Sequence, residues 1–122
     1  MGIHREIGLL EPELKKRVEK TIIALENANL PVLISETLRD LNVQKAYYAQ
    51  GRQPLFKVNQ LRKEAGLYLI NELENKNIVT NCDGINHKSK HQTRDENGYG
   101  YAIDLVPAKV DEHVHRINNK YR

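Results

Sequence analysis

Tryptophan is absent from this chain of 122 residues, and cysteine and phenylalanine each occur once. The lone cysteine, Cys82, excludes a disulfide bond within the chain. No apolar window approaches the roughly 20 residues of a membrane-spanning helix, and Met1–Glu6 lacks the apolar core of a signal peptide. We therefore expect a protein without a membrane span that is made in the cytoplasm without a signal peptide, so that any export would need help.

An excess of charge of one sign is also nearly missing, because 19 Lys and Arg residues face 16 Asp and Glu residues, a net charge of +3. Such an excess permits binding to an anionic surface but does not require it. The basic residues Lys57, Arg62, Lys63 and Lys76 are scattered, and there is little aromatic surface on which bases could stack. A nucleic-acid-binding module, whose binding would be salt-sensitive, is therefore the least favoured of the three hypotheses considered for this chain, and we expect no nucleic-acid partner.

The hydrophobic pattern predicts a single domain, 1–122, that combines helices with a small sheet. Residues 11–30 form a helix, because Pro12 suits a first turn and Val18 and Ile22 lie on one apolar stripe that ends before Pro31. The other predicted elements are strands over 31–37, 78–81 and 101–106, and helical segments over 42–50, 54–77 and 109–121. The predicted fold class is α+β: a small, mostly antiparallel sheet with packed helices and a metal site in a groove over the sheet.

The stretch from Ser89 to Asp104 carries the candidate chemistry. It opens with His91 in a polar segment and ends with Asp104 inside the apolar run Tyr101–Val106. A carboxylate buried in a strand is costly unless it is paired, hydrogen-bonded or bound to a metal. Imidazole and carboxylate are both zinc ligands, and a catalytic zinc site needs one protein ligand more. The alternative is that Asp104 pairs with an arginine and that His91 is a solvated loop residue.

These residues stand in an ordered motif, Ser89-x-His91 followed by Gly100-x-Ala102-x-Asp104. The motif resembles that of the zinc D-alanyl-D-alanine carboxypeptidases and the phage endolysin L-alanyl-D-glutamate peptidases, in which the histidine and the aspartate hold zinc. Thirteen positions separate His91 from Asp104 here, more than in the commonest form of the motif, because a polar, glycine-ended loop lies between them. A longer loop leaves both ligands in place.

A second block of sequence agrees with the same family in order and spacing. Arg39, Gln44 and Tyr48–Arg52 resemble its Arg-x-x-x-x-Gln followed by Tyr-Ala-Gln-Gly-Arg, and Val79–Asn81 resembles its Val-Thr-Asn segment. The resemblance implies that Arg39 and Gln44 bind substrate and that Ser89 orients the ligand loop or contacts substrate. The alternative for Arg39 is a surface ion pair that contributes little.

The C-terminal tail leaves two alternatives open. The family places its third zinc ligand and its catalytic acid well downstream of the aspartate, often as Glu-x-x-His. Here eighteen residues follow Asp104, and Glu112-His-Val-His115 begins only eight residues after it. Either Glu112 as catalytic residue and His115 as metal ligand complete the site, or this is a truncated form that lacks both partners. We predict the second case, an incomplete metal site with weak or no hydrolase activity.

The resemblance as a whole implies zinc-dependent hydrolysis of peptide bonds in bacterial peptidoglycan stem peptides, by a carboxypeptidase or an endolysin endopeptidase. Zinc would be the cofactor and the stem peptide the partner, with Arg39 holding a peptide carboxylate through its planar fork. The resemblance also implies that the protein acts at the bacterial cell wall after release or export. The alternative function is a non-catalytic cell-wall peptide-binding domain, or an inactive truncated peptidase that keeps the groove without the chemistry.

Overall fold

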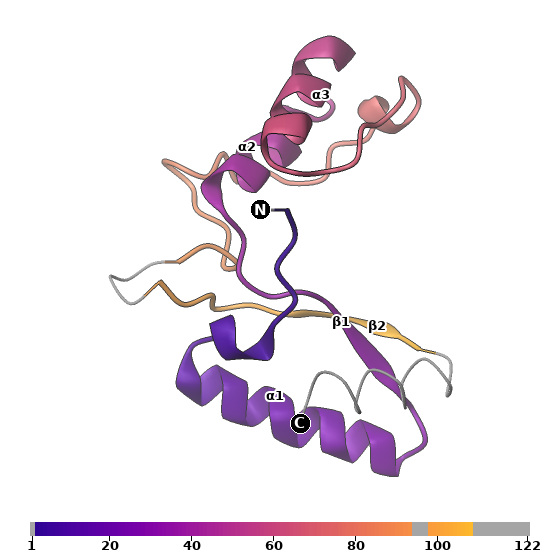
Figure 1. The fold of residues 1–122 in the computed structure, drawn as a ribbon, viewed down its shortest axis with the longest axis vertical. Coiled ribbons are helices and arrows are strands. Elements are labelled where there is room, and N and C mark those ends of the chain that lie inside the picture. The colour runs from indigo at the N-terminus through magenta and orange to yellow at the C-terminus, as the bar shows by residue number, and fades with distance from the viewer. Residues whose placement is uncertain (1, 94–97, 109–122) are drawn as a thin grey trace.

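A computed structural model describes residues 2–93 and 98–108 of the chain. Its elements in chain order are η1 (Ile7–Leu9), α1 (Pro12–Asn27), β1 (Val32–Glu36), α2 (Leu41–Ala49), α3 (Leu55–Glu64), η2 (Glu74–Lys76) and β2 (Asp104–Pro107). The strands form a two-stranded antiparallel sheet, so the predicted α+β class is confirmed. Figure 1 shows α1 beside the sheet at one end of the molecule and α2 and α3 at the other.

The helix α1 supplies Val18 and Ile22, two of the four buried residues of the hydrophobic cluster. The side chain of Glu11 accepts hydrogen bonds from the amides of Glu13 and Leu14, at 3.0 and 2.9 Å, and thereby satisfies the free donors of the first turn. Four buried residues then form the hydrophobic cluster: Leu10, Val18, Ile22 and Ile34. The predicted helix is confirmed, although it ends at Asn27, three residues before Leu30.

The two strands pair with an irregularity at the end where Glu36 and Asp104 lie. Val32 pairs with Pro107 and Ile34 with Leu105, but the next pair joins Glu36 to Asp104, so Ser35 is an extra residue on β1. Such a bulge bends the strand and changes the direction of the side chain that follows it. As a result, two carboxylates lie directly opposite one another across the strands.

The N-terminal segment fastens the loops at this end of the sheet. The carbonyl of His4 accepts a hydrogen bond from the amide of Thr37 at 2.8 Å, and the His4 ring lies 2.9 Å from the carboxylate of Asp40. The carbonyl of Leu9 accepts from the amide of Gly100 at 2.9 Å. Both loops that flank the strand ends are therefore tied to residues before α1.

Two predicted strands are wrong, wholly or in part. Residues 78–81 form no strand: Ile78 and Val79 are exposed, and Arg52 takes the carbonyl of Thr80 at 3.0 Å as a hydrogen-bond acceptor. The strand expected over 101–106 begins only at Asp104; the amide of Tyr101 donates to the carbonyl of Lys90 at 2.9 Å, outside the sheet. The helix predicted over 109–121 lies outside the described residues.

Candidate metal centre

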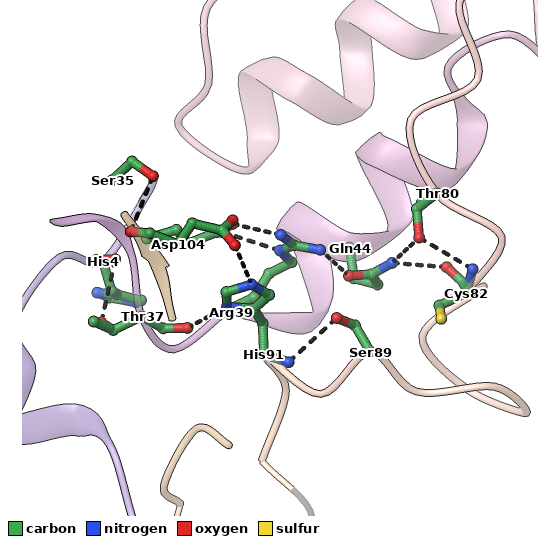
Figure 2. A network of polar contacts seen from close by, with 11 residues as sticks. His4, Ser35, Thr37, Arg39, Gln44, Thr80, Cys82, Ser89, His91 and Asp104 are labelled. Carbon is green, nitrogen blue, oxygen red and sulfur yellow. Dashed lines mark hydrogen bonds and ion pairs between the residues drawn. The ribbon is translucent and has the colours of Figure 1, made fainter. Parts of the chain in front are cut away.

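Three side chains that can bind a cation meet at the bulged end of the sheet. Glu36 comes from the end of β1, Asp104 from the start of β2, and His91 from the loop that precedes β2 in the chain. One donor atom of each lies within 4.8 Å of the others. Nε2 of His91 is 3.3 Å from Oδ1 of Asp104, and Figure 2 shows the two side chains facing each other.

The carboxylates of Glu36 and Asp104 lie opposite each other across the strand pair, so their negative charges must be balanced by positive groups nearby. Like charges directly opposite across a strand pair destabilise it. Glu36 is buried, with an exposed fraction of 6%, whereas the side chain of Asp104 is 55% exposed. The bulge at Ser35 creates this opposition, since regular pairing would place Ser35 across from Asp104. The backbone thus concentrates negative charge at one point of the sheet.

His91 is buried and held in one orientation. Its Nδ1 lies 2.7 Å from the carbonyl oxygen of Thr37, which can only accept, so Nδ1 carries the proton. Nε2 on the other side of the ring points toward Oδ1 of Asp104, 3.3 Å away. A metal ion between them would satisfy both, and a carbonyl behind the imidazole is the usual support of a metal-binding histidine.

The exposure of Asp104 differs from the expectation that its apolar run would bury it, and the alternative for His91 is also wrong. Asp104 was placed in a buried strand, but β2 has β1 as its single partner, so Ile103 and Leu105 face the core while Asp104 faces outward. The hypothesis that His91 is a solvated loop residue is wrong, since its exposed fraction is 8%. Asp104 is also not paired with an arginine within the described residues; its ion-pair partner there is His91.

A network of side chains around His91 fixes the loop that carries it. The hydroxyl of Ser89 accepts from the amide of His91 at 3.2 Å, and the side chain of Gln92 accepts from the amide of Ser89 at 2.9 Å. Gln92 also donates to the carbonyl of Gly84 at 3.1 Å. The predicted orienting role of Ser89 in the ligand loop agrees with these contacts, and its contact with substrate stays a prediction.

Arg39 and Gln44 lie beside the centre, joined to each other. Arg39 donates through Nε and Nη2 to both carboxylate oxygens of Glu36, the Nε bond measuring 3.0 Å. Its Nη1 donates to Oε1 of Gln44 at 2.9 Å, and Tyr47 covers the guanidinium at 4.9 Å. Burial lowers the pKa of Arg39, but the hydrogen bond and negative charge of Glu36 more than offset this, so the pKa is raised. Arg39 is therefore in a buried ion pair, and its role toward substrate stays a prediction.

A pocket of about 310 Å³ adjoins Arg39 on the side away from the sheet, with Tyr47 and Arg62 in its lining. Burial raises the pKa of Tyr47, and the charge of Glu36 raises it further, while Arg39 and Arg62 act against the rise. Nε of Arg62 donates to the carbonyl of Tyr68, and no carboxylate of the described residues forms an ion pair with it. The pocket thus offers the guanidinium of Arg62 to a ligand, although Glu74 also lines it and Arg39 is already paired with Glu36.

The sequence analysis missed Glu36. Its only signal was a carboxylate at the end of an apolar strand, three residues before the arginine of the family motif. Glu112 and His115 lie outside the described residues, so their predicted roles are untouched by this geometry, and a groove over the sheet also stays a prediction.

A scan against protein-family models and searches of curated proteins and of solved structures found no match to this chain. No helix among the described residues is both long and apolar enough to cross a bilayer. The candidate function therefore depends on the residues themselves and on the resemblance of the two sequence blocks.

Proposed function

We propose that this protein is a zinc-dependent hydrolase of peptide bonds in bacterial cell-wall stem peptides. The observation that carries the proposal is the orientation of His91, whose protonated Nδ1 is anchored on Thr37 while Nε2 faces Asp104. A histidine and a carboxylate that face each other at 3.3 Å fit a borderline cation such as zinc. Zinc bound there would lower the pKa of a bound water to about 7 and polarise a carbonyl group.

The protein's own residues have separate tasks in this proposal. His91 and Asp104 hold the metal, and Ser89 keeps the His91 loop in shape through the His91 amide. Proton transfer from water to the leaving amine needs a further general acid or base, a role worth about 10²–10⁴-fold in rate. We assign it to Glu112, and assign His115 to the metal, when the tail reaches the site.

A metal analysis combined with a cleavage assay tests the proposal. We expect about one zinc per chain in the purified protein, and a sharp fall in zinc content in His91→Ala and in Asp104→Ala. His87→Ala is the matched control, because His87 is exposed on the preceding part of the same loop and binds no cluster residue through its ring. Full zinc in both site variants would remove the basis of the proposal.

A non-catalytic peptide-binding domain is the second candidate. It is favoured by the small number of carboxylates at the cluster. Among the described residues these are Glu36 and Asp104, and Glu36 forms an ion pair with Arg39. This candidate predicts zinc binding and stem-peptide binding without cleavage products in mass spectrometry. Robust cleavage that Glu112→Gln and His115→Ala abolish would instead establish that the tail completes an active site.

A further inference from the structure

We propose that Glu36 is the third donor of the metal centre and that Arg39 and Gln44 are positioning residues that hold its carboxylate in place. This inference rests on the proposed metal site but assigns a ligand that neither sequence block of the resemblance contains. Glu36 would take the place that the resemblance gives to His115, so that the centre is a set of two carboxylates and one imidazole built from Glu36, His91 and Asp104.

Glu36 has the capacity to bind Arg39 and a metal at the same time. An ionised carboxylate offers about four lone-pair positions on its two oxygens. Arg39 uses one position on each oxygen, through Nε and Nη2. The free positions lie near the donor atoms of His91 and Asp104, since all three donor atoms fall within 4.8 Å of one another. Arg39 therefore orients Glu36 without using up its capacity as a ligand.

Arg39 is itself fixed from three directions. The two-point contact with Glu36 defines the plane of the guanidinium, and the ring of Tyr47 covers one face at 4.9 Å. Gln44 accepts from Nη1 at 2.9 Å, and the backbone amide of Arg39 donates to the carbonyl of His91 at 2.9 Å. The same residue thus holds one metal donor through its side chain and another through its backbone.

Gln44 extends this support to a distant segment. Its side chain is fully buried, with its oxygen on Arg39 and its nitrogen donating to the carbonyl of Cys82 at 2.7 Å and to the hydroxyl of Thr80 at 3.3 Å. Figure 2 shows this line of contacts running from the 80–82 segment through Gln44 and Arg39 toward His91 and Asp104. A buried amide with all its partners in place is a fixed support, as the outer hydrogen bonds around metal ligands are.

The geometry separates this role from that of a simple structural ion pair. A pair that served stability alone would need no second carboxylate opposite Glu36 and no imidazole aimed at the same point. Here the bulge at Ser35 brings Asp104 opposite Glu36, and Thr37 directs His91 to the same place. Arg39 balances the negative charge of Glu36, whereas the half-exposed carboxylate of Asp104, which faces Nε2 of His91, is available to a cation.

Metal affinity is the direct test, measured with zinc and a competing chelator on the full chain. We expect Arg39→Lys, which keeps the charge but loses the planar fork, to weaken zinc binding about 10–100-fold, as loss of an outer support does. Gln44→Met should weaken it in the same direction. Arg52→Lys is the matched control, because Arg52 also stacks on a tyrosine, Tyr48, at 4.0 Å but contacts none of the donors.

The double variant Glu36→Gln with Arg39→Met tests Glu36 itself and removes both members of the pair, so that no buried charge is left alone. We expect it to fold, as judged by circular dichroism, and to bind zinc more than about 100-fold more weakly. In the cobalt-loaded proteins the visible absorption bands should shift for Arg39→Lys and stay unchanged for Arg52→Lys.

Each outcome separates this inference from the proposed function. If the Glu36 and Arg39 variants keep the zinc affinity and cobalt spectrum of the unaltered chain while His91→Ala loses zinc, Glu36 is not a ligand and the inference fails alone. If the unaltered chain binds no zinc, both fail.

Discussion

Replacing Glu36 by glutamine in the metal-free protein should cost far more stability than loss of a surface ion pair. The side chains of Glu36 and Arg39 are only 8% and 11% exposed, so the change leaves a guanidinium almost without solvent and without its counter-charge. Breaking a buried pair on one side typically costs about 3–5 kcal/mol. Part of this is offset here, because Asp104 loses the repulsion of a second carboxylate. We therefore expect about 3 kcal/mol, a fall of roughly 10 °C in Tm for a chain of this size.

Urea unfolding in the presence of EDTA, followed by circular dichroism, measures this effect without stabilisation by bound metal. Glu13→Gln is the control: Glu13 pairs with Arg17 at 3.5 Å on the surface of α1, with side chains 61% and 77% exposed. Its loss should cost less than about 1 kcal/mol. Adding Arg39→Met to Glu36→Gln should recover part of the stability. Equal losses in Glu36→Gln and Glu13→Gln would refute the reasoning that burial makes this pair strong.

Three further variants probe the surroundings of the site. Gly100→Ala should lower stability by about 1–3 kcal/mol in thermal unfolding and should also weaken zinc binding. The new methyl group would lie 3.1 Å from Cα of Leu38 and 3.2 Å from the carbonyl oxygen of His91, and both are backbone atoms that cannot easily move. Full stability of this variant would show that the loops can separate freely. Asp83→Ala should destabilise at pH 7 but little near pH 2, since hydrogen bonds from the backbone, that of His87 first, lower the pKa of Asp83. That contribution is present above the unfolded pKa of about 3.9 and is lost as pH falls through the folded pKa, so a pH-independent difference in urea unfolding would contradict it. Arg62→Gln should weaken binding of a fluorescent acidic peptide by up to about tenfold without changing zinc affinity; unchanged fluorescence polarisation would exclude the pocket beside Arg39 as the ligand site.

The helices were predictable because their signals are local. The apolar stripe through Val18 and Ile22 recurs at helical spacing, and Pro12 and Pro31 bound it, so α1 follows from neighbouring residues alone. The strand expected over 78–81 failed for the opposite reason. A short apolar run becomes a strand only where another strand pairs with it. Here the side chain of Arg52 donates a hydrogen bond to the backbone carbonyl of Thr80 instead.

The burial of the site residues could not be inferred from sequence. Asp104 lies in an apolar run, but two features of the tertiary structure expose it. No further strand in the described part of the chain pairs with β2, and the neighbours of Asp104 in the run, Ile103 and Leu105, are the ones that pack against the core. His91 lies among polar residues, but contacts from Thr37 and Arg39, more than fifty positions away, enclose it. Both facts come from long-range pairing.

The sequence by itself determined the α1 helix and the α+β class, because periodicity and proline positions are properties of the chain, and its ordered motif, through a family resemblance, singled out His91 and Asp104 as candidates. Only the tertiary structure decided that Glu36 joins them and that Arg39 holds Glu36. One extra residue in β1 changes which side chain faces Asp104, and such a bulge arises from the pairing of residues 68 to 75 positions apart rather than from local preference.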